Sequence, residues 1–350
     1  MKQISGLEWS VTDWVFFAEG GAHILLAPAT QSLAVGRQLL RIRKSRLTPL
    51  SDVTCYLQQL REVYVPVFGE GHVLIPDVVC LSSSFVTDIF RTHRIQMDCH
   101  MTDPLTYALL IENVYPADGS LFIEVKPKCP LRERPNLPCR VTLEESKTSA
   151  DPYDPSDLFS SDSNVIQSGV WKLLSTRFCR VFDKTWKFED IHRRLVEFFS
   201  QHETREILSR LQTLQKVGTA KFACKALELM KKFPGFSENG DIAVLTDPET
   251  FLSEKIDTSE NAFRWIRRFL IARTAMDVSF LINFHGEEIS RFCVVDLDLK
   301  PASKIPFYAE QFEKAVSSQS LQTPQPREKQ GVGRGRIGRN QILDSALNLN

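Results

Sequence analysis

The sequence predicts an α+β fold with two lobes, a mostly β N-terminal lobe and a larger α/β C-terminal lobe. Short apolar or alternating runs separated by Gly, Pro and Ser fill the chain from Trp9 to about Asn113, which is the pattern of strands. Helical spacing dominates residues 188–232. Two more strand-like runs close the part of the chain expected to be ordered, before about Ser317.

The N-terminal lobe is expected to be a twisted sheet. Its strand-like runs are WVFF, HILLAPA, LLRIR, VYVPVF, HVLIP and YALLIE, each short enough for one strand. A further strand is predicted in SLFIEVKPK at residues 120–128. The polar, Pro-rich stretch over residues 130–163 indicates a long surface loop.

The C-terminal lobe is expected to be helical, with a late β-hairpin. Helices are predicted within residues 188–232 and from about Ser259, which is placed to cap the helix start, through Ala275. The runs DVSFLINF and RFCVVDLDLK then form two strands joined by a turn over residues 285–288.

The end of the chain loses apolar periodicity. Its Gln, Gly, Pro and Arg residues cannot bury enough surface to offset the entropy of ordering, so a disordered tail is expected. The GRGRIGR run within it is expected to be solvated, and no stable nucleic-acid partner is predicted. The predicted divisions are therefore 1–113 for the N-terminal lobe, 114–318 for the C-terminal lobe and 319–350 for the tail.

Composition argues against several classes of protein. Lys+Arg and Asp+Glu number 43 each, so the formal net charge is zero and an anionic ligand must be bound by a local patch. The eight cysteines show no CxxC pair, which indicates reduced thiols without a disulfide framework or structural zinc. No signal peptide, no run of about 18 apolar residues, and no HExxH, GxSxG or GxxxxGK[ST] motif is present. We expect an intracellular protein, in the nucleus and/or cytoplasm, with no membrane association.

Two aspartates of the predicted hairpin stand at equal distance from the Gly286–Glu287 midpoint. In a regular antiparallel pairing Asp277 and Asp296 would lie opposite each other, with Cβ atoms about 5 Å apart. Such like charges repel unless a cation lies between them, and Mg²⁺ would resolve the conflict. Phosphoryl transfer uses this arrangement, with a metal that neutralises charge and a carboxylate that accepts the proton of the attacking hydroxyl. A slipped register would instead point the two side chains apart.

In two predicted strands the alternation gathers charged side chains on one face. These sets are Asp296, Asp298 and Lys300, and Glu124, Lys126 and Lys128. A buried strand rarely carries charge along a whole face, so such a face is a candidate for function. An edge strand whose polar face meets water has the same pattern, so both interpretations stay open.

A glycine turn lies between two of the N-terminal strand-like runs. In EGGAH, which covers Glu19 to His23, the glycines allow the backbone to come close to phosphate oxygens. Arg41 and Arg43 share one face of the next strand and would reach the same phosphates. An ordinary hairpin turn is the alternative interpretation.

Taken in order, EGGAH, VGRQLLRIRK, EVKPKC, DPSDLF, TAMDVSFLI and VVDLDLKP resemble the inositol-pentakisphosphate 2-kinase family. EVKPKC and DLDLKP are the most specific of these motifs. The resemblance extends from about Asp13 to Tyr308 and is weak over 132–152 and much of 180–255. It implies a two-lobed kinase-like fold that uses ATP and Mg²⁺ to phosphorylate the axial 2-hydroxyl of inositol 1,3,4,5,6-pentakisphosphate, giving inositol hexakisphosphate.

The resemblance also implies roles for single residues. Asp277 matches the catalytic aspartate and belongs, with Asp296, to the metal site. The residues that match contacts to ATP are Glu19, Gly20, Gly21, His23 and Arg41, with Glu112 and Asn113 at the hinge beside the adenine. The residues that match contacts to the inositol phosphate are Lys126, Lys128, Arg140, Lys300, Lys304 and Tyr308. Five phosphates at about −1.5 to −2 each require such a convergence of Lys and Arg from distant segments.

The chain departs from the family pattern at several positions. Met276 replaces a lysine before the catalytic aspartate, His23 replaces an asparagine, and Lys304 stands where some relatives have arginine. A basic segment after Cys129 is shortened to about residues 139–141. That change motivates a second hypothesis, a catalytically weak scaffold that binds inositol phosphates, and a third is a kinase for another small hydroxyl substrate. A monomer is expected in each case.

Overall fold

The structure is a computed structural model that describes most of the chain up to residue 319. The chain divides into two compact units, residues 1–312 and 313–350, and the second is described only as far as Gln319. Gly21 and the predicted tail from residue 320 onward lie outside the described residues. The described ranges are 3–6, 8–20, 22–29, 37–44, 48–95, 104–115, 120–128, 139–147, 149–182, 185–237 and 255–319.

The N-terminal part folds into a mixed sheet, as its alternating runs predict. In the described residues the strand order is β1-β5-β6-β4-β3-β2, with β1 and β5 parallel and the other neighbours antiparallel. Ile24, Leu40 and Leu110 share one apolar core with Ile89 of α3 (Ser83–Thr92). The strands are β1 (Gln3–Ser5), β2 (Trp14–Glu19), β3 (His23–Pro28), β4 (Gln38–Arg43), β5 (Asp77–Ser82) and β6 (Leu105–Glu112).

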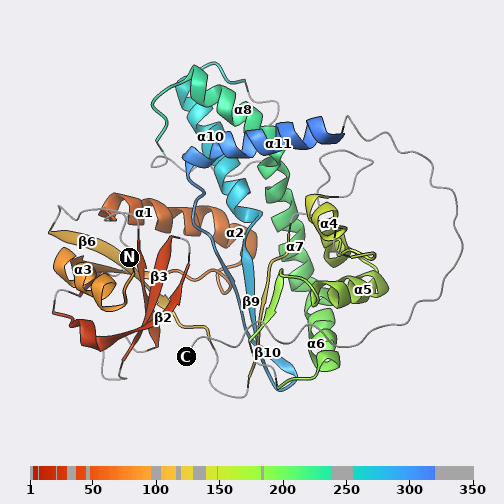
Figure 1. Cartoon of the computed structure of the whole chain (residues 1–350), viewed down its shortest axis with the longest axis horizontal. Coiled ribbons are helices and arrows are strands. Elements are labelled where there is room, and N and C mark those ends of the chain that lie inside the picture. The colour runs from red at the N-terminus through yellow and green to blue at the C-terminus, as the bar shows by residue number, and fades with distance from the viewer. Residues whose placement is uncertain are drawn as a thin grey trace, which may run out of the picture. The chain divides into compact units, whose positions relative to one another are not determined.

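A second, antiparallel sheet contains the predicted hairpin. Its order in the described residues is β10-β9-β7-β8, and β9 and β10 form a long pair (Figure 1). Gly286 and Glu287 make the turn between them, and Gly286 has φ of 61°, a conformation that glycine adopts without a steric penalty. The strands are β7 (Leu121–Val125), β8 (Cys179–Val181), β9 (Ser279–His285) and β10 (Glu288–Val295).

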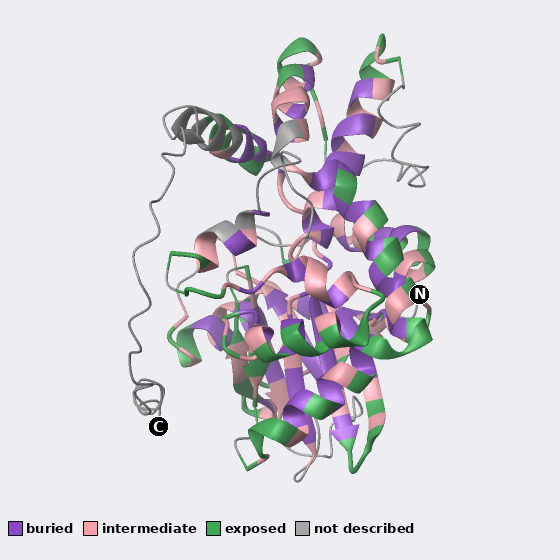
Figure 2. Ribbon diagram, turned by 90° about the vertical axis from the view of Figure 1, so that its right-hand side faces the viewer, coloured by how far each residue is buried: buried purple, intermediate pink, exposed green. Residues whose placement is uncertain are grey.

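The helical middle of the chain is confirmed. α6, α7 and α8 cover the predicted region 188–232, and α10 (Ser259–Ala275) has the predicted bounds. Its cap is one residue earlier than predicted, because Thr258 Oγ1 accepts the bond from Asn261 N at 3.2 Å. Buried and exposed residues alternate along the helices (Figure 2). The remaining bounds are α4 (Arg140–Glu145), α5 (Ser163–Leu173), α6 (Phe188–Ser200), α7 (His202–Gln215), α8 (Ala220–Lys232) and α11 (Ile305–Gln319).

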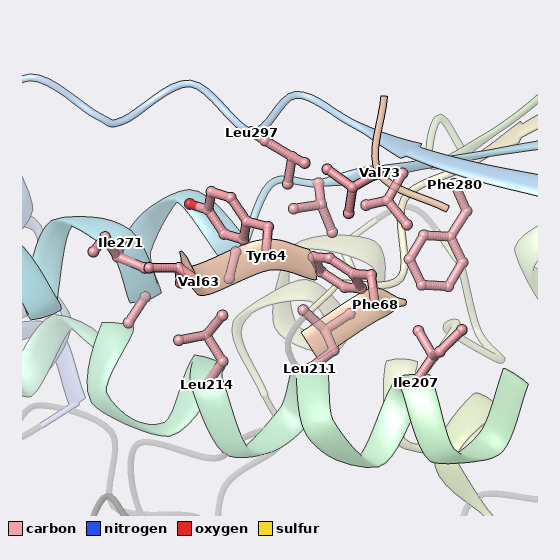
Figure 3. Packing of buried hydrophobic residues seen from close by; sticks show 14 of the residues in the cluster. Val63, Tyr64, Phe68, Val73, Ile207, Leu211, Leu214, Ile271, Phe280 and Leu297 are labelled. Carbon is pink, nitrogen blue, oxygen red and sulfur yellow. The ribbon is translucent and has the colours of Figure 1, made fainter. Parts of the chain in front are cut away.

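The run VYVPVF, predicted as a strand, is helical instead. α1 (Leu50–Gln59) continues directly into a π-helical turn, η2 (Leu60–Tyr64), and then into α2 (Val65–Phe68). Tyr64 and Phe68 are fully buried in a core that they share with α7 and β9 (Figure 3). A short apolar run suits either a strand or a buried helix, so the packing against α7 decides between them here.

The Pro-rich stretch is not a plain surface loop. Its described part contains α4 and a 3₁₀ turn, η3 (Pro155–Phe159), and it buries Tyr153 and Leu158 in the main core. The predicted strand HVLIP contributes an isolated bridge between Val73 and Val294, and β5 follows it in DVVCLS. In both places apolar residues find buried partners that local composition does not indicate.

The α+β class and the two-lobed fold predicted from the sequence are confirmed by these two sheets and their helices. Glu112 ends the first sheet and Leu121 begins the second, so one short connection joins them. Within the described residues, no helix combines the length and the apolar character needed to cross a bilayer.

Candidate active site

Three segments of the second sheet end or begin at the same place. The last residues of β7 and β10, Val125 and Val295, pair with Phe280 and Ser279 at the start of β9. The residues after β7, before β9 and after β10 are therefore neighbours in space. These segments carry most of the charged side chains of the predicted site.

Asp277 lies between two lysines at this end of the sheet. Lys128 Nζ is 2.7 Å from its Oδ1, and Lys300 Nζ is 3.2 Å from its Oδ2. Burial by itself would raise the pKa of Asp277, but the two ammonium groups outweigh burial and hold that pKa well below its usual range. At neutral pH Asp277 is therefore an ionised carboxylate with one cation on each oxygen.

Asp296 forms a second group beside it. Lys126 Nζ lies 3.2 Å from Asp296 Oδ2, and the Ser279 hydroxyl contacts the same oxygen at 2.9 Å. The Ser279 hydroxyl is also 2.8 Å from Glu124 Oε1. Asp296 has φ of 64°, which is uncommon for a residue other than glycine. Residues held in such conformations cluster at functional sites.

The predicted register of the hairpin is wrong by one residue. The pairing is regular next to the turn, where Glu288 lies opposite His285, but a bulge between Ile289 and Arg291 shifts the remainder. As a result Val295 pairs with Ser279 and the ladder ends there. The two aspartates do not form a directly opposed pair, although both lie just beyond the end of the ladder.

A tight turn brings the two lysines after β7 to this site. Lys126 N donates to Phe178 O at 2.8 Å, and Lys128 N donates to Lys126 O at 2.8 Å, which closes a three-residue turn around Pro127. The lysines predicted to share a face thus both reach site carboxylates, Lys126 that of Asp296 and Lys128 that of Asp277.

Arg41 of β4 joins the first sheet to the segment after β10. Its guanidinium forms a short ion pair with Asp298 and also donates to His23 Nδ1 at 3.1 Å. Burial raises the pKa of Asp298, but Arg41 outweighs burial and lowers that pKa overall. A guanidinium only donates hydrogen bonds, so His23 accepts through Nδ1 and is neutral.

We expect His23 to make stability depend on pH. Burial, with a further contribution from Arg41, lowers its pKa to about 4 from the ordinary value of 6.5. Below pH 6.5 the unfolded chain binds a proton that the folded chain rejects, so the unfolding free energy falls as pH drops from 6.5 towards 4. His23→Asn should reduce this slope. Denaturant unfolding of both proteins across that range measures the slopes, and equal slopes would contradict the assignment.

The predicted nucleotide loop is the β2–β3 turn. Gly20 N donates to His23 O at 2.9 Å, and Lys44 Nζ pairs with Glu19 Oε1 at 2.7 Å. The described part of the loop is therefore a hydrogen-bonded hairpin turn whose acidic side chain is held by a lysine. Its contact with ATP stays a prediction.

The predicted hinge residues lie where the two sheets connect. Glu112 Oε2 accepts a bond from Arg291 Nη2 of β10 at 2.5 Å, so an ion pair spans the two sheets. Asn113 Oδ1 accepts a bond from Tyr115 N at 3.0 Å, which fixes the chain direction after β6. Adenine binding by Glu112 and Asn113 stays a prediction.

Three predicted substrate residues are not part of the ion-pair cluster as described. Lys304 is exposed in the turn η5 (Ala302–Lys304), and no ion pair is found for it among the described residues. Tyr308 is buried in α11 beneath the guanidinium of Arg273, which lies 4.2 Å from the ring centre. Arg140 begins α4, and its side chain lies outside the described part of the chain.

Several residues that contact the predicted site residues were not themselves predicted as site residues from the sequence. Glu124 and Asp298 share predicted strand faces with the site lysines, and that alternation was a usable signal. Ser279 and Thr274 lie within the TAMDVSFLI motif, but the residue pattern alone assigned no role to either hydroxyl. Thr274 Oγ1 is buried, contacts Asp298 O at 3.2 Å and accepts from Lys300 N at 3.0 Å.

The two joined sheets, with lysines and aspartates gathered where three strands meet, provide the kinds of charged groups that a kinase uses. The model of the inositol-pentakisphosphate 2-kinase family matches residues 16–314, so the chain belongs to that family. The resemblance predicted from the sequence motifs is thereby confirmed, and every predicted site residue lies within the matched range. A comparison with curated proteins gave no significant match.

Proposed function

We propose that this chain transfers the γ-phosphate of ATP to the axial 2-hydroxyl of inositol 1,3,4,5,6-pentakisphosphate, giving inositol hexakisphosphate and ADP. The observation that carries the proposal is the position of Asp277, whose two carboxylate oxygens each meet a lysine, Lys128 and Lys300. A carboxylate among ammonium groups suits a site that must place a hydroxyl beside many phosphates.

The proposed reaction assigns one task to each of these side chains. The 2-hydroxyl oxygen forms a bond to the γ-phosphorus while the bond from that phosphorus to the bridging oxygen of ADP breaks. Asp277 accepts the proton of the hydroxyl. Its low pKa makes it a weak base while both lysines contact it. In the proposed complex the phosphates would compete for Lys128 and Lys300, which would return the pKa of Asp277 towards its ordinary value.

Two carboxylates, those of Asp277 and Asp296, match the number of protein ligands that Mg²⁺ takes in a kinase. In the described ranges no group of three or more His, Cys, Asp or Glu side chains could hold a metal. Mg²⁺ in kinases takes one or two carboxylates, and phosphate oxygens and water complete its shell. Asp296 and Asp277 would hold the ion. Asp296 is half-exposed, and each of the two carboxylates is paired with a lysine in this structure. When bound, Mg²⁺ neutralises charge on the transferred phosphoryl group.

We expect Lys128→Met to weaken the binding of inositol pentakisphosphate about 10-fold or more, because a hydrogen bond to a charged group contributes about 1.5–3 kcal/mol. Lys128 is largely buried, so water does not screen its interaction with phosphate as it screens that of a surface lysine. Calorimetric titration of the wild type and the variant at one fixed salt concentration measures the change.

Lys172→Met is the matched control for that titration. Lys172 is similarly shielded and forms a 2.6 Å ion pair with Asp151, but it lies on α5 outside the site. Its removal should leave the affinity unchanged. An equal loss of affinity in both variants would mean that overall charge, and not this cluster, binds the substrate.

The proposed function is tested by incubating the purified chain with ATP, Mg²⁺ and inositol pentakisphosphate and measuring both ADP and inositol hexakisphosphate. Production of the two in equal amounts supports a kinase. Tight binding of the inositol phosphate without product would instead support the scaffold, and product only from a less phosphorylated inositol would support a kinase of different acceptor preference.

A further inference from the structure

A buried hydroxyl joins two carboxylates at the end of the hairpin. Ser279 is fully buried at the first position of β9, and its Oγ lies 2.8 Å from Glu124 Oε1 and 2.9 Å from Asp296 Oδ2. The two acids come from different strands, since Glu124 belongs to β7 and Asp296 follows β10. Ser279 is thus the side chain of the middle strand that touches the acids on both of its neighbours.

This arrangement needs a positive charge. A serine hydroxyl has one hydrogen and donates to one carboxylate at a time. The second carboxylate receives no hydrogen bond from Ser279, and the two negative charges repel each other. Lys126 Nζ supplies the compensating charge, at 3.2 Å from Asp296 and 3.8 Å from Glu124. The cluster therefore holds two acids beside the ammonium group of Lys126, and the contacts of Lys126 and Ser279 to Asp296 both fall on its Oδ2.

The backbone around Asp296 is fixed from the other side. Asp296 adopts φ of 64°, which is uncommon for a residue other than glycine. The next side chain, Leu297, is buried in the main core (Figure 3), and the carbonyl of Asp298 contacts the buried hydroxyl of Thr274 at 3.2 Å. With the chain anchored after Asp296, the contacts with Ser279 and Lys126 orient its carboxylate.

We infer that Ser279 is a positioning residue, which holds the Asp296 carboxylate beside Glu124 in the orientation that receives the Mg²⁺ of bound Mg·ATP. This inference rests on the proposed function, which identifies Mg·ATP as the ligand that brings the metal ion. Groups that orient a metal-binding side chain typically change metal affinity or activity about 10–100-fold when they are removed. Ser279 itself is buried and is not expected to touch the nucleotide.

Ser279→Ala removes the hydroxyl with little change in volume. We expect the half-saturating Mg²⁺ concentration of turnover to rise about 10-fold or more, while KM for inositol pentakisphosphate stays within about 2-fold, because Lys128 and Lys300 are held by Asp277. Independently of activity, the extra thermal stabilisation that ATP gives with Mg²⁺, compared with ATP and EDTA, should be largely lost. Ser279→Thr, which keeps a hydroxyl, should recover part of both.

Ser290→Ala is the control on the same hairpin. Its exposed hydroxyl donates to Asn283 O at 3.1 Å near the turn, so its loss should leave both measurements unchanged. If Ser279→Ala does not fold, Ser279→Cys, which has only a weak donor, takes its place with the same expectation. A folded Ser279 variant with wild-type Mg²⁺ dependence and a wild-type Mg²⁺-dependent thermal shift would overturn the inference.

The outcomes for the two proposals are distinguishable. A wild-type chain that shows the Mg²⁺-dependent thermal shift but makes no inositol hexakisphosphate would refute the kinase reaction and leave the role of Ser279 standing. A wild-type chain that ATP stabilises equally with Mg²⁺ and with EDTA would overturn the role of Ser279.

Discussion

Asp277→Asn is expected to lower the rate of phosphoryl transfer by about 10²–10⁴-fold, the range typical of a lost proton acceptor. The substitution keeps the shape of the side chain but removes its charge and its ability to take the hydroxyl proton. Binding of inositol pentakisphosphate should be retained or strengthened, because Lys128 and Lys300 lose the carboxylate that competes with phosphate for them. Single-turnover transfer from γ-labelled ATP and calorimetric titration separate the two effects.

Asp88→Asn is a suitable control for this prediction. Asp88 is half-exposed on α3 and pairs with Arg91 at 3.0 Å, so its loss removes an ordinary surface ion pair. It should leave transfer unchanged. If Asp277→Asn transferred phosphate as fast as Asp88→Asn, the role of Asp277 as proton acceptor would be contradicted.

Phe68→Ala is expected to lower the unfolding free energy by about 3–5 kcal/mol, the range for emptying a large aromatic site in a core. Phe68 ends the helical segment 50–68 and is fully buried among Ile207 and Leu211 of α7 and Phe280 of β9 (Figure 3). The cavity would lie where a segment from the N-terminal half meets the second sheet. Denaturant unfolding of the wild type and the variant measures the loss.

Phe307→Ala provides the comparison, since that ring is 52% exposed on α11. Its removal should change the unfolding free energy by no more than about 0.5 kcal/mol, as is usual for surface positions. Similar losses in the two variants would contradict the burial of Phe68 and the helical assignment that depends on it.

Strands and helices with clear periodicity could be predicted from the sequence. The β9–β10 hairpin, the helices of residues 188–232 and the bounds of α10 follow from the spacing of apolar residues and from the glycine at position 286. The run VYVPVF could not be predicted, because a short apolar segment suits both states and only its burial against α7 makes it helical. Tyr153 was missed for a related reason, since its core partners are far away in the sequence.

The candidate site was predictable where charge alternates along a strand. Lys126 and Lys128 reach Asp296 and Asp277 as their shared face suggested, although a three-residue turn and not a continued strand brings them there. The bulge near Ser290 was not predictable, because no glycine or other local signal marks it, and it displaces the register that had placed the two aspartates face to face.

Phosphorus NMR of one reaction mixture is the most direct measurement of what this cluster of lysines and carboxylates does. With the chain, ATP, Mg²⁺ and inositol 1,3,4,5,6-pentakisphosphate together, we expect one new phosphomonoester signal on carbon 2 and ADP in equal amount. ATP that stays intact, or that is hydrolysed to inorganic phosphate while the inositol phosphate is unchanged, would contradict the proposed reaction.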